Sequence, residues 1–172
     1  MPRHLVTVPH QQHPADKPGF RVSEAQWPRD AEDLRSVREA VFVREQGVAL
    51  ALERDGLDLP SLHLIARDAD GQPIGAARLA PNGRIGRMAV LPAWRGRGVG
   101  RALLAAAVKL AKEQGLDKVE LHAQRHASGF YREAGFLETG DVFMDAGIPH
   151  VRMVQRIDSR ARRQRESGSN CA

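Results

Sequence analysis

The sequence predicts an α+β domain of three layers, in which a mixed and mostly antiparallel sheet of about six to seven strands carries helices on both faces. Three observations predict this fold. Apolar stretches joined by Asp-Gly and Asn-Gly turns fill much of the first half of the chain. A glycine-rich turn and a long amphipathic helix come next. The strand that follows this helix implies a right-handed crossover, and therefore one parallel pair within the sheet.

The antiparallel half contains four predicted strands, at residues 20–25, 62–67, 74–79 and 85–91. A helix is predicted at 28–46, because Pro28 suits a first turn and Gly47 can end a helix. Its apolar residues recur at helical spacing, at Leu34, Val37 and Val41. The segment 49–59 lacks a clear period and bears several acids, so we expect it to be irregular.

The second half begins with a predicted helix at 98–114, which Gly115 is placed to end. A strand at 118–124 follows, and then a short helix at 126–134 that Gly135 ends. Two closing strands are predicted at 136–144 and 150–156. Segments with the alternating apolar pattern of strands and segments with the apolar spacing of helices thus both occur along the chain, as a layered α+β domain requires.

Composition limits the class of protein. The 172 residues suit one domain, and 42% hydrophobic with 27% charged residues is typical of a globular protein. No apolar run approaches the roughly 18 residues of a transmembrane helix, and the first twenty residues lack a signal-peptide core. The single cysteine, Cys171, excludes an intramolecular disulfide and a cysteine zinc site. We expect a cytoplasmic protein without a metal or a membrane partner.

The net charge of +5 is concentrated near the end of the chain, where five arginines and two acids follow residue 154. The middle of the chain is nearly neutral. We therefore expect a poorly ordered leader at 1–19, one domain at 20–156, and a basic flexible tail at 157–172. Such a tail suits contact with nucleic acid, but the neutral body favours a solubilising role instead.

The glycine-rich turn is the main candidate binding site. Gly96, Gly98 and Gly100 lie between a predicted strand and a predicted helix, with Arg95, Arg97 and Arg101 among them. Backbone N–H groups at a helix start bind phosphate, and glycines let the backbone approach it closely. A P-loop would need Gly-Lys-Ser/Thr, and a dinucleotide fingerprint would need glycine at 101. The turn therefore predicts a different phosphate or pyrophosphate site.

Two ordered motifs carry a family resemblance. The first is Arg95-x-x-Gly98-x-Gly100 after the strand at 86–92, and the second is Gln124-x-x-Ala127-x-x-Phe130-Tyr131-x-x-x-Gly135-Phe136. Over residues 20–154 the chain resembles the GNAT superfamily of N-acetyltransferases. Segments 41–46, 53–58, 121–124 and 147–150 resemble its ElaA/YjcF-like branch. The resemblance implies a GNAT-like fold and acetyl-CoA as co-substrate, with an acetyl group moved directly to a primary amine in a ternary complex.

The resemblance also implies roles for particular residues. Tyr131, the single tyrosine, stands at the position of the general acid. Backbone groups of the strand and the turn would hold acetyl-CoA, and polar or small residues downstream would contact its pantetheine arm. The cofactor-binding residues implied are Met88, Ala89, Val90, Arg95, Gly96, Arg97, Gly98, Val99, Gly100, Arg101, Gln124, Ala127 and Tyr131.

The general base and the acceptor remain open at this point. Glu45, His63 and His122 are the candidate bases, and each has a structural alternative as a surface or core residue. Glu45, Asp55 and Asp58 are candidates for binding a small cationic amine acceptor. A non-catalytic acyl-CoA-binding or sensor domain is the alternative function. The sequence leaves a homodimer open.

Overall fold

A computed structural model describes residues 19–157. Residues 1–18 and 158–172 lie outside the described part, so the predicted leader, the basic tail and Cys171 are not tested by it.

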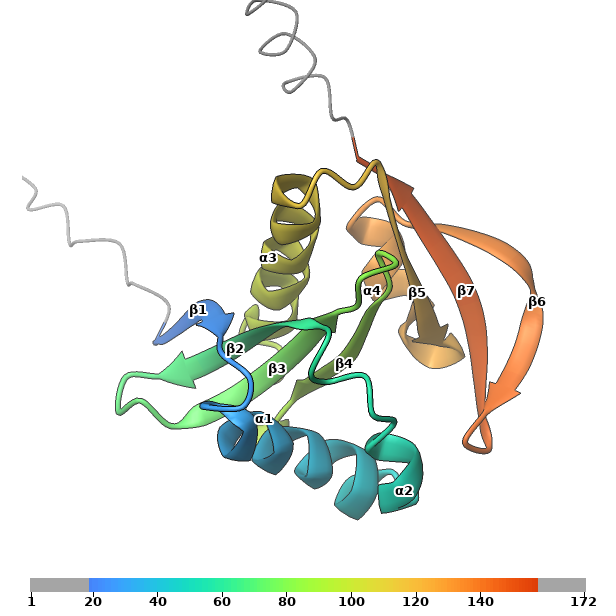
Figure 1. Cartoon of the computed structure of the whole chain (residues 1–172). Coiled ribbons are helices and arrows are strands. Elements are labelled where there is room, and N and C mark those ends of the chain that lie inside the picture. The colour runs from blue at the N-terminus through green and yellow to red at the C-terminus, as the bar shows by residue number, and fades with distance from the viewer. Residues whose placement is uncertain (1–18, 158–172) are drawn as a thin grey trace, which may run out of the picture.

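Seven strands form two antiparallel sheets (Figure 1). The first sheet has the order β1-β2-β3-β4, and the second has the order β5-β7-β6. The strands of the first sheet are β1 (Phe20–Ala25), β2 (Leu62–Asp68), β3 (Pro73–Leu79) and β4 (Ile85–Val90). Those of the second are β5 (Lys118–Gln124), β6 (Leu137–Asp145) and β7 (Ile148–Arg156).

The expected parallel pair between β4 and β5 is reduced to one contact. Arg84 and Glu120 form an isolated parallel bridge, and the Glu120 N–H donates to the Gly83 carbonyl at 3.1 Å. Beyond this bridge the two strands diverge, as Figure 1 shows. The single mixed sheet expected from the sequence is therefore split, although the α+β class and the strand count are confirmed.

A β-bulge in β4 lies where the strands diverge. Ala76 of β3 pairs with Ala89 and Arg78 pairs with Gly86, so β4 carries one extra residue over this stretch. Arg87, within the bulge, has a φ of 50°, which is uncommon for a residue with a side chain. A bulge bends its strand and interrupts the ladder, so β4 turns away from β5.

The helices are α1 (Ala31–Arg38), a π-helical segment (Glu39–Glu45), α2 (Leu50–Glu53), α3 (Val99–Glu113) and α4 (Ser128–Glu133). The first helix begins at Ala31 instead of Pro28, because the Ala31 N–H closes a turn on the Pro28 carbonyl at 3.0 Å. The segment predicted to be irregular contains the single helical turn of α2. No helix within residues 19–157 is long and apolar enough to cross a membrane.

Helices cover both faces of the first sheet, which confirms the three layers (Figure 1). On one face, Leu34 and Val37 of α1 pack against Ile65 and Ala89. On the other, α3 approaches β3 so closely that a Cβ at Gly75 would lie 2.9 Å from Leu103 Cδ1. Glycine is therefore required there, and this packing fixes the start of α3 beside the end of β4.

Candidate functional site

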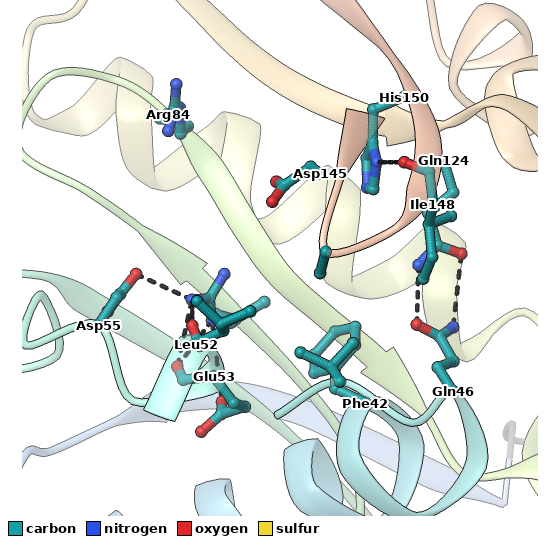
Figure 2. A pocket seen from close by; sticks show the side chains of 13 residues that line it. Phe42, Gln46, Leu52, Glu53, Asp55, Arg84, Gln124, Asp145, Ile148 and His150 are labelled. Atoms are coloured by element: carbon teal, nitrogen blue, oxygen red, sulfur yellow. Dashed lines mark hydrogen bonds and ion pairs between the residues drawn. The ribbon is translucent and has the colours of Figure 1, made fainter. Parts of the chain in front are cut away.

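A cleft opens where β4 and β5 diverge. It consists of two adjoining cavities of about 250 and 240 Å³. Both are lined by residues of the π-helical segment, β4, β5 and the β6–β7 hairpin, several of which Figure 2 shows. The residues common to the two cavities are Phe42, Gln46, Arg84, Arg87, Gln124, Asp145 and His150.

The π-helical segment brings Phe42 and Gln46 to the cleft. Its wider winding is seen in the Gln46 N–H, which donates to the Val41 carbonyl at 3.0 Å. The side-chain amides of Gln46 and Gln124 then bond reciprocally across the cleft, at 2.8 and 3.4 Å (Figure 2). Gln124, a predicted cofactor contact, therefore lies in the cleft with its amide engaged by Gln46.

Tyr131 lies in the second cavity, half-buried. Its hydroxyl donates to the Met88 sulfur at 3.9 Å, and its ring packs edge-on against Phe130 and Phe136. Burial raises the pKa of Tyr131 to about 12, because the apolar surroundings disfavour the phenolate. The structure thus brings this residue, a proton donor at neutral pH, to the β4 bulge.

The start of α3 has the features of an anion site. Gly96 and Gly98 have φ values of 73° and 85°, which favour glycine. The first α3 hydrogen bond runs from the Ala102 N–H to the Gly98 carbonyl, and no side chain caps the helix. The N–H groups of Val99, Gly100 and Arg101 are therefore outside the helical pattern, where they and the helix dipole attract anions.

The arginines of the turn differ in their surroundings. Arg95 binds the Glu45 carboxylate with both terminal nitrogens, at 2.7 and 2.6 Å, and its Nε donates to the Val90 carbonyl. Arg97 lies over the Trp94 ring at 5.0 Å, and the exposed Arg101 is 3.8 Å from Glu133. The charge of Arg95 is thus matched by Glu45, whereas Arg97 and Arg101 lie beside the start of α3.

The three candidate bases are not brought together. The hydrogen bonds from Arg95 lower the pKa of Glu45, which lines neither cavity. His63 is buried outside the cleft, stacked on Trp27, with Nε2 2.8 Å from the Asp58 carbonyl oxygen. Only His122, on β5, lines a cavity of the cleft.

His122 is held by contacts on two sides. Its Nε2 lies 3.1 Å from Arg84 Nη2, and its ring meets Phe143 edge-on. Because a guanidinium can only donate, Nε2 accepts this bond and carries no proton. Burial first, and then the positive charge of Arg84, lower the pKa of His122 below its usual value. His122 is therefore a neutral imidazole at pH 7.

Asp55 and Asp58 belong to a network of three carboxylates and three arginines. Both bind Arg78, at 2.6 Å for Asp55 and 2.8 Å for Asp58. Asp55 also binds Arg87 at 2.9 Å. Although burial opposes it, the Arg78 hydrogen bond lowers the pKa of Asp55 to about 2. Asp55 lines one cavity, whereas Asp58 is buried within the network.

Several cleft residues were not predicted from the sequence: Phe42, Gln46, Arg84, Arg87, Asp145 and Ile148. Asp145 ends β6 just before a tight turn at Ala146 and Gly147, which both have positive φ. Ala-Gly is not among the residue pairs typical of a hairpin turn, and the sequence around Arg84 carries no signal beyond the Asn-Gly turn before it. Their positions depend on the divergence of β4 from β5. No group of three metal-ligating side chains occurs within residues 19–157.

Comparison with known proteins places this geometry in context. Residues 30–157 match the family model described as an acetyltransferase (GNAT) domain. The chain is 37% identical over 127 residues to a Bacillus subtilis protein named uncharacterized N-acetyltransferase YjcF, covering 72% of this chain and 90% of that protein.

Solved structures are similar as well. One is an acyl-CoA N-acyltransferase from Pseudomonas aeruginosa, with a TM-score of 0.70 and 32% identity, covering 79% of this chain and 99% of that one. Another is Escherichia coli ElaA, with a TM-score of 0.70 and 28% identity, covering 79% and 99%.

Proposed function

The chain belongs to the GNAT acetyltransferase family, and on that premise we propose that it moves an acetyl group from acetyl-CoA to the primary amine of a small acceptor. The observation that carries the proposal is the cleft itself. One end meets Tyr131 and the β4 bulge, and the uncapped start of α3 lies beside the same strand. Acyl transfer from acetyl-CoA needs a proton donor near the leaving sulfur and a site that binds the phosphates of CoA.

Acetyl-CoA would supply the acetyl group as a thioester. The N–H groups of Val99, Gly100 and Arg101, together with the exposed Arg97 and Arg101, fit its pyrophosphate. The bulge leaves part of β4 without ladder partners, so backbone N–H groups near Met88 are suited to donate to the thioester oxygen as it gains charge.

The chemistry requires three proton transfers, two from the amine nitrogen and one to the sulfur. An alkyl amine has a pKa of about 10.4, so removing its proton at pH 7 costs roughly 4–5 kcal/mol without help. His122, neutral and in the cleft, takes that proton. The amine nitrogen then bonds to the acetyl carbon, the carbon–sulfur bond breaks, and Tyr131 protonates the sulfur. The nitrogen gives its second proton to the Tyr131 phenolate, which restores the hydroxyl, and the proton on His122 is released to solvent.

Ligand binding tests the cofactor part of the proposal. We expect calorimetry to show micromolar binding of acetyl-CoA and CoA, and none of NAD. Gly98→Ala is expected to weaken CoA binding tenfold or more, because a side chain at a φ of 85° shifts the N–H groups after it. Gly71→Ala is the matched control, since Gly71 has a φ of 81° in the β2–β3 turn.

Both glycine variants are expected to lose about 1–2 kcal/mol of stability. If Gly71→Ala weakened CoA binding as much as Gly98→Ala does, the loss would reflect general instability, and the α3 phosphate site would be wrong. Absence of CoA binding by the unchanged protein would overturn the proposed function.

The pH dependence tests the base. Because the pKa of His122 is lowered, kcat/KM is expected to rise with pH through a limb centred below 6.5. His122→Ala should lower kcat/KM by about 100-fold and abolish this limb. His63→Gln should keep the limb, because His63 is buried outside the cleft. A limb that survives His122→Ala, or is lost with His63, contradicts the assignment.

A further inference from the structure

Some charged side chains of the cleft are not balanced by an oppositely charged neighbour, and these indicate the kind of acceptor that the cleft can bind. The buried network balances three arginines, Arg38, Arg78 and Arg87, against Glu53, Asp55 and Asp58. The acids of residues 53–58 are therefore already neutralised and offer no free negative charge to an acceptor. Two charged residues that line both cavities, Arg84 and Asp145, stand outside this network.

Arg84 carries a positive charge that the protein matches only weakly. Its nearest carboxylate is Glu120, 4.0 Å away, and Glu120 accepts a hydrogen bond from Arg152 at 2.5 Å. Two arginines thus share one carboxylate. The guanidinium of Arg84 has five N–H donors, of which one is engaged by His122. Its side chain is 44% exposed, so the remaining donors are accessible to an anion.

Asp145 carries the opposite charge. No cation among residues 19–157 lies within ion-pair distance of its carboxylate. It ends β6 on the hairpin side of the cleft, and in Figure 2 it lies between Arg84 and His150. The cleft therefore presents one weakly matched cation and one carboxylate without an ion-pair partner among residues 19–157, which complements a molecule that carries both charges.

The distance between Arg84 and His122 limits which acceptors can contact both side chains. Arg84 Nη2 and His122 Nε2 are 3.1 Å apart. In an α-amino acid the amine nitrogen and the carboxylate oxygens are separated by two carbons, or about 3 Å. One such molecule can place its carboxylate on Arg84 and its amine on His122. The carboxylate would replace His122 as the partner of Arg84, which leaves the Nε2 lone pair available to the amine.

Part of the wall of the cavity of about 250 Å³ is apolar. This apolar part is formed by Phe42 and Val48 from the π-helical segment and the turn after it, by Leu52 of α2, and by Ile148 of β7, and the amides of Gln46 and Gln124 lie beside it. Apolar walls with a few convergent charged groups are typical of a site that orients a small ligand by its polar end.

We propose that the acceptor is a free α-amino acid with an apolar side chain, anchored by its carboxylate on Arg84. This rests on the proposed acetyl transfer. The amino acid loses one proton from its ammonium to His122, its nitrogen bonds to the acetyl carbon, and the thioester sulfur leaves with a proton from Tyr131. The nitrogen then loses its second proton to the Tyr131 phenolate, and His122 releases its proton to solvent. The products are an N-acetyl amino acid and CoA.

The test compares leucine with 3-methylbutylamine, which is leucine without its carboxylate, by following thiol release with acetyl-CoA. Arg84→Gln is expected to lower kcat/KM for leucine by about 10- to 100-fold more than for the amine. The amine is the internal reference, because any effect of the substitution through His122 falls on both acceptors. Asp145→Asn is the matched variant and should affect both equally, since both carry an ammonium group.

Equal losses for the two acceptors in Arg84→Gln would overturn the carboxylate anchor. So would turnover of 3-methylbutylamine without turnover of leucine, or a lack of leucine binding to the CoA-loaded protein. In each of these cases acetyl transfer still stands, because acetyl-CoA binding is measured separately by calorimetry. If acetyl-CoA itself does not bind, the proposed function and the acceptor assignment fail together.

Discussion

Tyr131→Phe is expected to lower kcat by about 100- to 10,000-fold, the usual contribution of a general acid. The substitution removes one oxygen and keeps the ring, whose packing against Phe130 and Phe136 is apolar. Within residues 19–157 the hydroxyl makes a single long contact, 3.9 Å from the Met88 sulfur. Little stability depends on it, so the loss should be confined to turnover.

Three measurements separate this role from a packing role. The steady-state rate of thiol release gives kcat, calorimetry gives the affinity for acetyl-CoA, and urea unfolding gives the free energy of unfolding. We expect the affinity for acetyl-CoA to stay within about threefold, and the free energy of unfolding within about 1 kcal/mol, of the values for the unchanged protein. A kcat within twofold of it would contradict the general-acid assignment. If the unchanged protein binds acetyl-CoA but transfers it to no amine, the non-catalytic acyl-CoA-binding domain is favoured instead.

Arg38→Ala is expected to lower the free energy of unfolding by about 3–5 kcal/mol, the typical cost of breaking a buried ion pair. Arg38 is 1% exposed and binds Glu53 and Asp58. The Glu53 carboxylate is equally buried, Arg38 binds its Oε1, and its Oε2 has no hydrogen-bond partner within residues 19–157. Removing the Arg38 guanidinium leaves that buried charge with only the longer contact to Arg87, at 3.8 Å.

The matched control is Arg44→Ala, an exposed arginine of the π-helical segment that follows α1, which should change stability by less than 0.5 kcal/mol. A second comparison is the double variant Arg38→Met with Glu53→Leu. It should recover most of the loss, because Asp58 keeps its bond to Arg78 and no buried charge is left alone. A small loss in Arg38→Ala, measured by urea unfolding, would show that the network contributes little.

The same network bears on activity. Arg87 donates to the Glu53 carbonyl at 3.1–3.2 Å and binds Asp55, so the network holds the bulge residue whose φ is 50°. Weakening the network should therefore loosen the bulge where Tyr131 meets β4.

The sequence alone suggests Asp55 and Asp58 as candidates for acceptor binding. A run of acids gives no sign of the arginines that come from distant strands to bind it.

Local patterns determined most of the fold. The turn signals at 70–71 and 82–83 and the periodicity of residues 99–113 predicted the hairpins and α3 within a residue or two. Two spaced motifs predicted the family, because each motif consists of residues that are close in the chain. The π-helical winding at residues 39–45 was not predicted, since its apolar spacing also suits an ordinary helix.

By itself, the sequence determined the α+β class, the seven strands with the long helix α3, and the family. Only the tertiary structure decided that β4 and β5 part after a single bridge, that Glu45 is held by Arg95, and that His122 alone among the candidate bases reaches the cleft. The reason is physical. Periodicity and turn chemistry depend on residues that are close in the chain. The protonation and accessibility of a side chain depend on charged groups and packed side chains that come from distant segments.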